Sequence, residues 1–467
     1  MITSSERRRF GVWLAAVIVV VGFSACLAAN YPGHFTPDSV WQLAQGREGR
    51  FNDWHPPVMA WLLGVADHIV PGAGPFMTFD AVLFYCGLLA FAALEPRPRP
   101  AGLAILALWM VSPLALVFQG AVLKDVLFAD FALAGFAALA WAGRCWNRRF
   151  LRWALLVLAS GFLTITALTR QNGLIVPIFA ALALAAMVYT RGPRTSRMST
   201  RLARSAVAAG AGLALVMVFA SVATLALRTY GDGRHEGRHH LNILQVWDLA
   251  GAAGRDSRLE LPALHVRAPK VEAFVRRSAA PAYRSAGADN IVTLPGGALL
   301  TNPPGPSLGE DWLRLVVARP GLYLNLRAKV WLDTLLTPTT ANCPMVFVGV
   351  DGGGRQALLR RAGLATRDDD RDDWDWDYAA AFFGTPLFSH AAYGLTILGI
   401  LGVSIWRWRR GARDPGLIVG AAMGLAGVAF AASFFVVSVD CDYRFLYFLD
   451  VAAMALAVSA ACARGPP

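Results

Sequence analysis

Residues 10–42 read FGVWLAAVIVVVGFSACLAANYPGHFTPDSVWQ, an apolar run that is followed at once by a short polar stretch. A helix needs about 20 mostly apolar residues to cross a bilayer, and residues 10–29 supply them. Comparable runs occur at 75–94, 101–118, 126–143, 153–168, 174–190, 205–227, 388–406, 416–438 and 445–462. The sequence therefore predicts an all-α polytopic membrane protein with about ten transmembrane helices.

The composition agrees with this class. Hydrophobic residues make up 56% of the 467 residues and charged residues 16%, with a mean hydropathy of +0.47. This leaves too little polar surface to cover soluble domains of that size. The net charge of +12 could suggest nucleic acid, but the basic residues occur in short clusters between apolar runs. The six cysteines form no CxxC pair, which argues against zinc-ribbon and thioredoxin-type proteins.

Basic residues predict the orientation, because Lys and Arg are retained on the cytoplasmic side of a membrane. With the N-terminus inside, the inner connections hold 19 basic residues and the short outer loops hold five. We therefore expect both termini in the cytoplasm. The alternative for the first run, which follows Arg7-Arg8-Arg9, is a cleaved signal peptide. We favour an uncleaved helix, because the later helices need no separate export signal.

The long connection at 228–387 is predicted to be an extracytoplasmic domain. It carries the remaining 19 basic residues and is interrupted by proline and glycine clusters. We expect a mixed α/β or irregular structure, inserted between seven helices in 1–227 and three helices in 388–467. Gly321–Leu336 has the spacing of a packing helix, and Met345–Val350 that of a short strand.

Seven aspartates between Asp368 and Asp377 could bind a hard cation. Their spacing is not that of a calcium loop, so we interpret this stretch as a solvated acidic loop.

The first outer loop, residues 30–57, is dense in side chains capable of chemistry. Thr36-Pro37 is typical of a helix start, with Thr as N-cap and Pro in the first turn, and predicts a short helix to about Gly46. Asp38 then lies in its first turn, just outside the bilayer, where a membrane enzyme would meet a lipid-borne substrate. The structural alternative is equally consistent with the local sequence: Asp38 would complement the free amides of the helix start.

Three more outer loops carry polar residues, and alternating spans bring them to the same face. They contain Lys124-Asp125, Arg170-Gln171-Asn172-Gly173 and Asp442-Tyr443-Arg444. Outer cations break the positive-inside trend and invite an anionic partner such as a lipid phosphate. They could instead be anchors at the membrane border.

These loops, together with Asn52-Asp53-Trp54-His55-Pro56-Pro57, resemble the polytopic C-type-fold glycosyltransferases that use polyprenyl-phosphate-linked sugars. The resemblance covers the membrane part of the chain. It implies that Asp38 is the catalytic base, with Asp53 and His55 beside it, and that Lys124, Arg170 and Arg444 hold the donor phosphate. The residues expected to contact substrate are Trp41, Trp54, Asp125, Asn172, Asp442 and Tyr443.

The resemblance further implies transfer of a hexosyl or pentosyl group to a lipid, glycan or protein acceptor of the cell envelope. The reaction would take place at the outer face of a bacterial cytoplasmic membrane, without nucleic acid as a partner. Asp38-Ser39 stands where the aminoarabinose and mannosyl transferase members have an Asp-Glu pair. No metal-binding residue is therefore assigned, and a divalent cation is left open as a cofactor.

Two other functions remain open at this point: an O-antigen polymerase or ligase, and a lipid or glycan transporter. The polymerase or ligase would use arginines in the large loop at 228–387. A transporter would need charges buried in mid-helix, and Asp130 and Asp450 lie near helix ends. No Walker loop or GxSxG elbow supports ATP-driven transport or lipase chemistry.

Cys343 and Cys441 are the two cysteines that the predicted topology places outside, where oxidation is permitted. A disulfide between them would tie the large loop to the loop carrying Arg444. Two free thiols are the alternative.

Overall fold

The fold is described from a computed structural model. The structure describes residues 4–52, 54–191, 197–229, 238–285, 287, 291, 294–300, 306–337, 343–411 and 414–463. Within these ranges, eight helices are long and apolar enough to cross a membrane. They are α1 (Ser4–Asn30), α4 (Gly74–Ala93), α7 (Lys124–Arg144), α8 (Arg149–Thr169), α10 (Met198–Arg228), α20 (His390–Arg409), α21 (Pro415–Val437) and α22 (Tyr447–Cys462), the last preceded by the 3-10 turn η5 (Tyr443–Leu446). These eight correspond to eight of the ten predicted runs, and the fold is that of a polytopic helical membrane protein.

The two other predicted runs are helical but differ from simple spans. The run at 101–118 is a pair, α5 (Pro100–Met110) and α6 with η1 (Pro113–Gly120), bent by 60°. Proline lacks the N–H that continues a helix, and Ser112 caps a new helix by accepting a hydrogen bond from the Ala115 amide. The run at 174–190 is α9 (Ile175–Arg191), whose 17 residues are fewer than in any of the eight spans when η5 is counted with α22.

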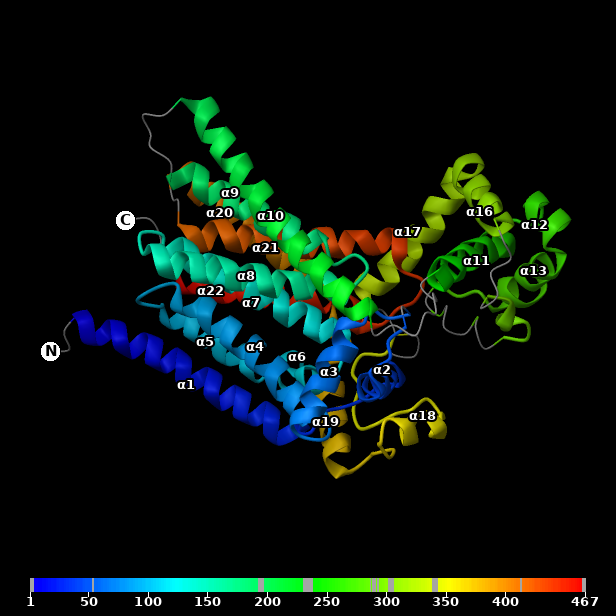
Figure 1. The fold of residues 1–467 in the computed structure, drawn as a ribbon, viewed down its shortest axis with the longest axis horizontal. Helices are drawn as coiled ribbons and strands as arrows, with labels where there is room; N and C mark the ends of the chain where they lie inside the picture. The colour runs from blue at the N-terminus through cyan, green and yellow to red at the C-terminus, as the bar shows by residue number, and fades with distance from the viewer. Residues whose placement is uncertain are drawn as a thin grey trace.

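The bundle has two unlike ends (Figure 1). At the arginine end, α7 and α9 finish at Arg144 and Arg191, and Arg191 donates a hydrogen bond to the Gly143 carbonyl at 2.8 Å. At the α2 end, α2 (Pro37–Glu48) and α3 (Val58–Ile69) lie beside the long connection that leads to α20. Basic connections therefore share one end of the bundle, as predicted. Which end faces the cytoplasm stays a prediction.

Helix α2 forms where the sequence predicts it. Thr36 is the N-cap and Pro37 occupies the first turn, and Thr36 and Ser39 form a reciprocal capping box. The Thr36 amide donates to the Ser39 hydroxyl at 2.8 Å. Asp38 therefore has a fixed position in the first turn of a well-capped helix.

A pair of glycines brings α2 against α3. A Cβ atom at Gly46 would lie 2.4 Å from the Ala60 carbonyl oxygen, and one at Gly64 would lie 2.6 Å from the Gly46 oxygen. Only glycine permits such a close approach of two helix backbones. This contact holds the helix that carries Asp38.

The residues just before α2 are bound on both sides by backbone hydrogen bonds. The His34 amide donates to Gly120 at 2.9 Å, and the Phe35 amide donates to Gly349 at 2.8 Å. His34 thereby forms an isolated bridge with Ala121, and Phe35 one with Val350. These bridges fix α2 relative to the start of α7 and to the segment after residue 343.

The described part of 228–387 consists of helices, short helical turns and irregular segments. The helices are α11 (Arg238–Arg255), α12 (Pro262–Arg267), α13 (Pro269–Phe274), α14 (Ala280–Ala282), α16 (Ser307–Ala318), α17 (Pro320–Leu336), α18 (Gln356–Arg361) and α19 (Asp370–Ala380), and the helical turns are η2 (Val275–Ala279), η3 (Gly297–Leu300) and η4 (Pro386–Phe388). Helices α11 to α17 enclose a hydrophobic core of their own around Trp247 and Leu326. Residues from Cys343 onward instead join the core of the membrane bundle.

Two expectations for this region are wrong. Met345–Val350 forms no strand, because the only bridges in it are the single ones of Val350 to Phe35 and Arg367. The aspartates from residue 370 form α19 rather than a solvated loop, since Asp369 caps the helix. Asp372 and Asp375 are buried, and Asp372 forms an ion pair with Arg367 at 3.0 Å.

Candidate active site

Three predicted residues, two from the first outer loop and one from the last, meet at the α2 end. The Asp38 carboxylate lies 3.0 Å from Nη2 of Arg444 and 3.5 Å from Nε2 of His55. Burial alone would raise the pKa of Asp38, but Arg444 and His55 outweigh it and hold that pKa well below its usual range. Asp38 is therefore a carboxylate at neutral pH, and its side chain is 34% exposed.

The contact with Lys124 defines the tautomer of His55. Nζ of Lys124 lies 2.9 Å from Nδ1 of His55. When Lys124 carries its ammonium charge it can only donate, so Nδ1 accepts and the ring proton is assigned to Nε2, facing Asp38. Burial and the neighbouring Lys124 lower the pKa of His55 to about 4. His55 is thus neutral at pH 7 and orients the carboxylate of Asp38.

A second group of charges adjoins the first. Arg170 forms an ion pair with Asp125. Nε of Arg444 lies 2.6 Å from Oδ2 of Asp442 and 3.8 Å from Oδ2 of Asp125. Burial and the nearby Arg444 lower the pKa of Arg170 to about 9, so it stays charged at neutral pH. Four loops distant in sequence thus contribute three basic and three acidic side chains to one cluster.

Aromatic rings surround the two arginines, and sequence reasoning missed them. The guanidinium carbon of Arg170 lies 5.3 Å from the centroid of Phe434 and 5.7 Å from that of Phe445. That of Arg444 lies 5.4 Å from the centroid of Phe347. Rings at these distances stabilise a cation whose solvation is reduced. In the sequence, only the adjacency of Arg444 and Phe445 indicated that aromatic rings pack against these arginines.

A disulfide joins Cys343 to Cys441, as hypothesised from the topology. The Tyr443 amide, two residues further on, donates to the Pro344 carbonyl at 3.0 Å. The segment carrying Phe347 is therefore fastened to the loop carrying Arg444.

The other residues predicted to contact substrate make contacts with the rest of the protein. Trp41 is half-buried against the membrane core, and the Trp54 amide donates to Asn52. Asn172 donates to Ser433 at 2.8 Å. Tyr443 is fully buried, with its ring 4.1 Å from that of His390, so it packs inside the protein. Asp53 lies outside the described residues.

No metal site emerges from the described residues: none of their His, Cys, Asp and Glu side chains form a group of three or more that could hold an ion. The three carboxylates of the cluster instead converge on Arg444.

The fold and this cluster define a polytopic helical membrane protein with an ionised acid, a neutral histidine and three basic side chains at one end. The fold is similar to that of the Archaeoglobus fulgidus oligosaccharyltransferase with a tethered acceptor peptide (11% identity, 96% of this chain, 49% of that chain, TM-score 0.43). It is also similar to AglB from the same organism, in complex with an inhibitory peptide and a dolichol-phosphate (13%, 96%, 50%, TM-score 0.41). A third similar structure is ArnT from Cupriavidus metallidurans in the apo state (15%, 96%, 77%, TM-score 0.32).

The chain spans about half the length of the oligosaccharyltransferase structures that it matches. Its sequence matches no protein-family model and none of the curated proteins. At this level of similarity only the arrangement of helices is compared, so a function has to follow from the residues of the site.

Proposed function

We propose that this protein is a membrane glycosyltransferase that moves a sugar from a polyprenyl-phosphate donor to a lipid, glycan or protein acceptor. The observation that supports it is the Asp38 carboxylate, held between neutral His55 and the Arg444 guanidinium beside the membrane helices. The basic side chains of Lys124 and Arg170 lie beside them. A base beside several cations suits displacement of a phosphate from carbon.

In the proposed reaction, an acceptor hydroxyl attacks the anomeric carbon of the sugar. The bond from that carbon to the phosphate oxygen breaks, and polyprenyl phosphate leaves with the electron pair. Asp38 takes the acceptor proton, while Arg444 and Arg170 stabilise the charge on the departing phosphate. His55 holds the Asp38 carboxylate toward the acceptor.

Donor binding would also activate the base. Arg444 is the main cation that lowers the pKa of Asp38. A donor phosphate that engages Arg444 would neutralise part of that cation and so raise the pKa of Asp38. A pKa nearer to the working pH makes a better general base. Asp38 would therefore gain basicity only when the donor is in place.

The outer face of the membrane is the proposed place of reaction. The described basic connections gather at the arginine end, opposite to α2, and such connections are typically cytoplasmic. The site would then face the compartment that also permits the Cys343–Cys441 disulfide.

The test is a transfer assay with the purified chain in proteoliposomes. Polyprenyl-phosphate hexoses and pentoses would be supplied with membrane extract as the source of acceptors. Mass spectrometry should detect release of polyprenyl phosphate and a glycosylated product. Absence of both across the whole panel, from folded protein, would contradict the proposal.

A proton-coupled lipid or glycan transporter is the second candidate, and one observation favours it. Asp80 and Asp130 are both buried within membrane helices, and Asp130 accepts a hydrogen bond from Gln119 at 3.0 Å. Intramembrane carboxyls often mark ion pathways. Substrate-dependent proton flux in the same proteoliposomes, without any glycosylated product, would support the transporter.

A further inference from the structure

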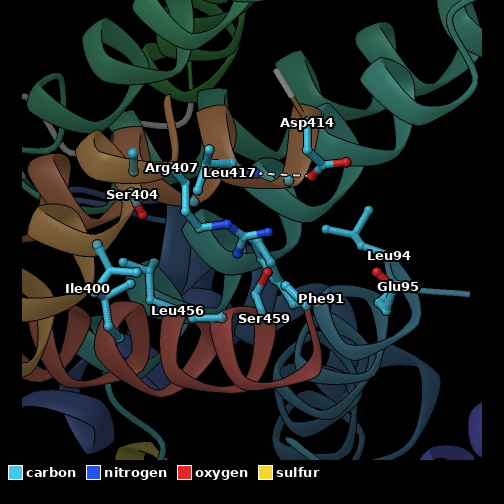
Figure 2. A pocket seen from close by; sticks show the side chains of 16 residues that line it. Phe91, Leu94, Glu95, Ile400, Ser404, Arg407, Asp414, Leu417, Leu456 and Ser459 are labelled. Atoms are coloured by element: carbon cyan, nitrogen blue, oxygen red, sulfur yellow. Dashed lines mark hydrogen bonds between the residues drawn. The ribbon is translucent and has the colours of Figure 1, made fainter. Parts of the chain in front are cut away.

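A cavity of about 190 Å³ lies at the arginine end of the bundle, at the opposite end from Asp38. Figure 2 shows it between α4, α20, α21 and α22. The proposed transfer reaction does not use this cavity.

The lining changes from polar to apolar along the helices. Glu95 follows the last residues of α4, Arg407 lies in the last turn of α20, and Asp414 is the N-cap of α21. Ile400 and Phe91 line the deeper part. Ile400 precedes Arg407 by seven residues, which is about 10 Å of helix rise. A polar group over an apolar wall at this depth matches the division between a lipid headgroup and its chains.

The cavity is reached from the side of the bundle. Val403 lines it on α20 and is 54% exposed, on a stretch of helix that is apolar enough to lie in the membrane. A ligand can therefore enter from the bilayer and leave its chains there. The volume suits a headgroup and the first methylene groups rather than a whole lipid.

The charges around the cavity select among headgroups. Among the described residues that line the cavity, one guanidinium, on Arg407, faces two carboxylates, on Glu95 and Asp414 (Figure 2). The Asp414 carboxylate is fixed in place, because it accepts a hydrogen bond from the Leu417 amide at 3.3 Å. A phosphodiester that also bears a primary ammonium would place a negative charge beside the guanidinium and a positive charge beside the carboxylates. An anionic headgroup without an ammonium would be repelled by the two carboxylates.

We propose that this cavity binds one aminophospholipid, such as phosphatidylethanolamine. Its phosphate lies at Arg407, and its ammonium lies between Glu95 and Asp414. The inference does not depend on the proposed glycosyl transfer.

Native mass spectrometry of the purified full-length chain tests it, with phosphatidylethanolamine or phosphatidylglycerol added. The wild type should retain one phosphatidylethanolamine in preference to phosphatidylglycerol. Arg407→Gln should weaken that binding about tenfold, as expected for one charge-assisted hydrogen bond. Arg409→Gln is the matched control, because Arg409 is exposed in the same helical turn and does not line the cavity.

Two further variants test separately the space in the cavity and its carboxylates. Ala421 lines the cavity, so Ala421→Trp should fill it and prevent binding without a change of charge. Glu95→Gln with Asp414→Asn should turn the preference toward phosphatidylglycerol. Equal binding of both lipids by the wild type, or equal losses in Arg407→Gln and Arg409→Gln, would overturn the proposal. Bound phosphatidylethanolamine should also raise the melting temperature of the wild type and of Arg409→Gln.

Discussion

Nη2 of Arg444 lies 3.0 Å from Oδ2 of Asp38, although 406 positions separate the two residues in the chain. The pair joins the first loop after α1 to the last loop before α22. It makes Asp38 an ionised but weak base in the free protein and gives Arg444 a partner that a phosphate can replace. Base strength and phosphate binding are thereby coupled through one contact.

Replacing Arg444 should change the pH dependence of transfer as well as its rate. In Arg444→Ala the pKa of Asp38 should rise, because its main opposing cation is lost. The acid limb of kcat/KM against pH should therefore move to higher pH than in the wild type. Arg50→Ala is the control, since Arg50 is exposed at the same end of the bundle. An unmoved acid limb would show that Arg444 does not govern the basicity of Asp38.

Arg170 should contribute to donor affinity. Arg170→Gln should weaken binding of a polyprenyl-phosphate analogue by about tenfold or more, as expected for a lost charge-assisted hydrogen bond. Because this variant leaves Asp125 unpaired, the double variant Arg170→Gln, Asp125→Asn controls for that effect. If the double variant binds the analogue like the wild type, Arg170 serves only to neutralise Asp125.

His55 should make stability sensitive to acid. In the unfolded chain His55 binds a proton below its ordinary pKa of 6.5, whereas in the folded chain it does so only near 4. The unfolded state therefore binds more protons between these values, and stability should fall as the pH falls through this window. The loss is at most about 3 kcal/mol.

Thermal unfolding in detergent measures this effect. The melting temperature of His55→Gln should depend less on pH between 6.5 and 4, whereas that of His265→Gln, altered at an exposed histidine, should follow the wild type. Identical pH profiles for His55→Gln and the wild type would refute the assignment of a buried neutral histidine.

The Cys343–Cys441 disulfide should stabilise the protein, because it closes a loop of 98 residues. Replacing both cysteines by serine should lower the free energy of unfolding by about 2–4 kcal/mol. In denatured wild-type protein, these two thiols should react with a maleimide only after reduction. Labelling of both without reductant would show that the bridge is absent.

The sequence predicts best what the bilayer imposes. Long apolar runs must become helices in lipid, because every backbone polar group needs a partner within the segment. Thr36 and Pro37 predict α2 by local capping alone. Alternating spans bring every second loop to one side, which explains why the sequence alone groups Lys124 and Arg170 with Asp38.

Contacts between distant segments could not be predicted in this way. Phe347 reaches Arg444 because a disulfide and a backbone hydrogen bond fasten its segment there. Asp372 is buried beside His34, at 3.3 Å, and not solvated with its acidic neighbours. Such pairings depend on how loops fold over the bundle, and they cannot be predicted from the composition of the segments.

Asp38→Asn tests the central claim most directly, because it keeps the shape of the side chain and removes its basicity. The variant should bind a polyprenyl-phosphate analogue at least as well as the wild type, since Arg444 loses a competing carboxylate. Its turnover should nevertheless fall by about a hundredfold or more, while Asp373→Asn, at an exposed position of α19, should behave as the wild type. Wild-type turnover by folded Asp38→Asn protein would contradict the assignment of Asp38 as the base.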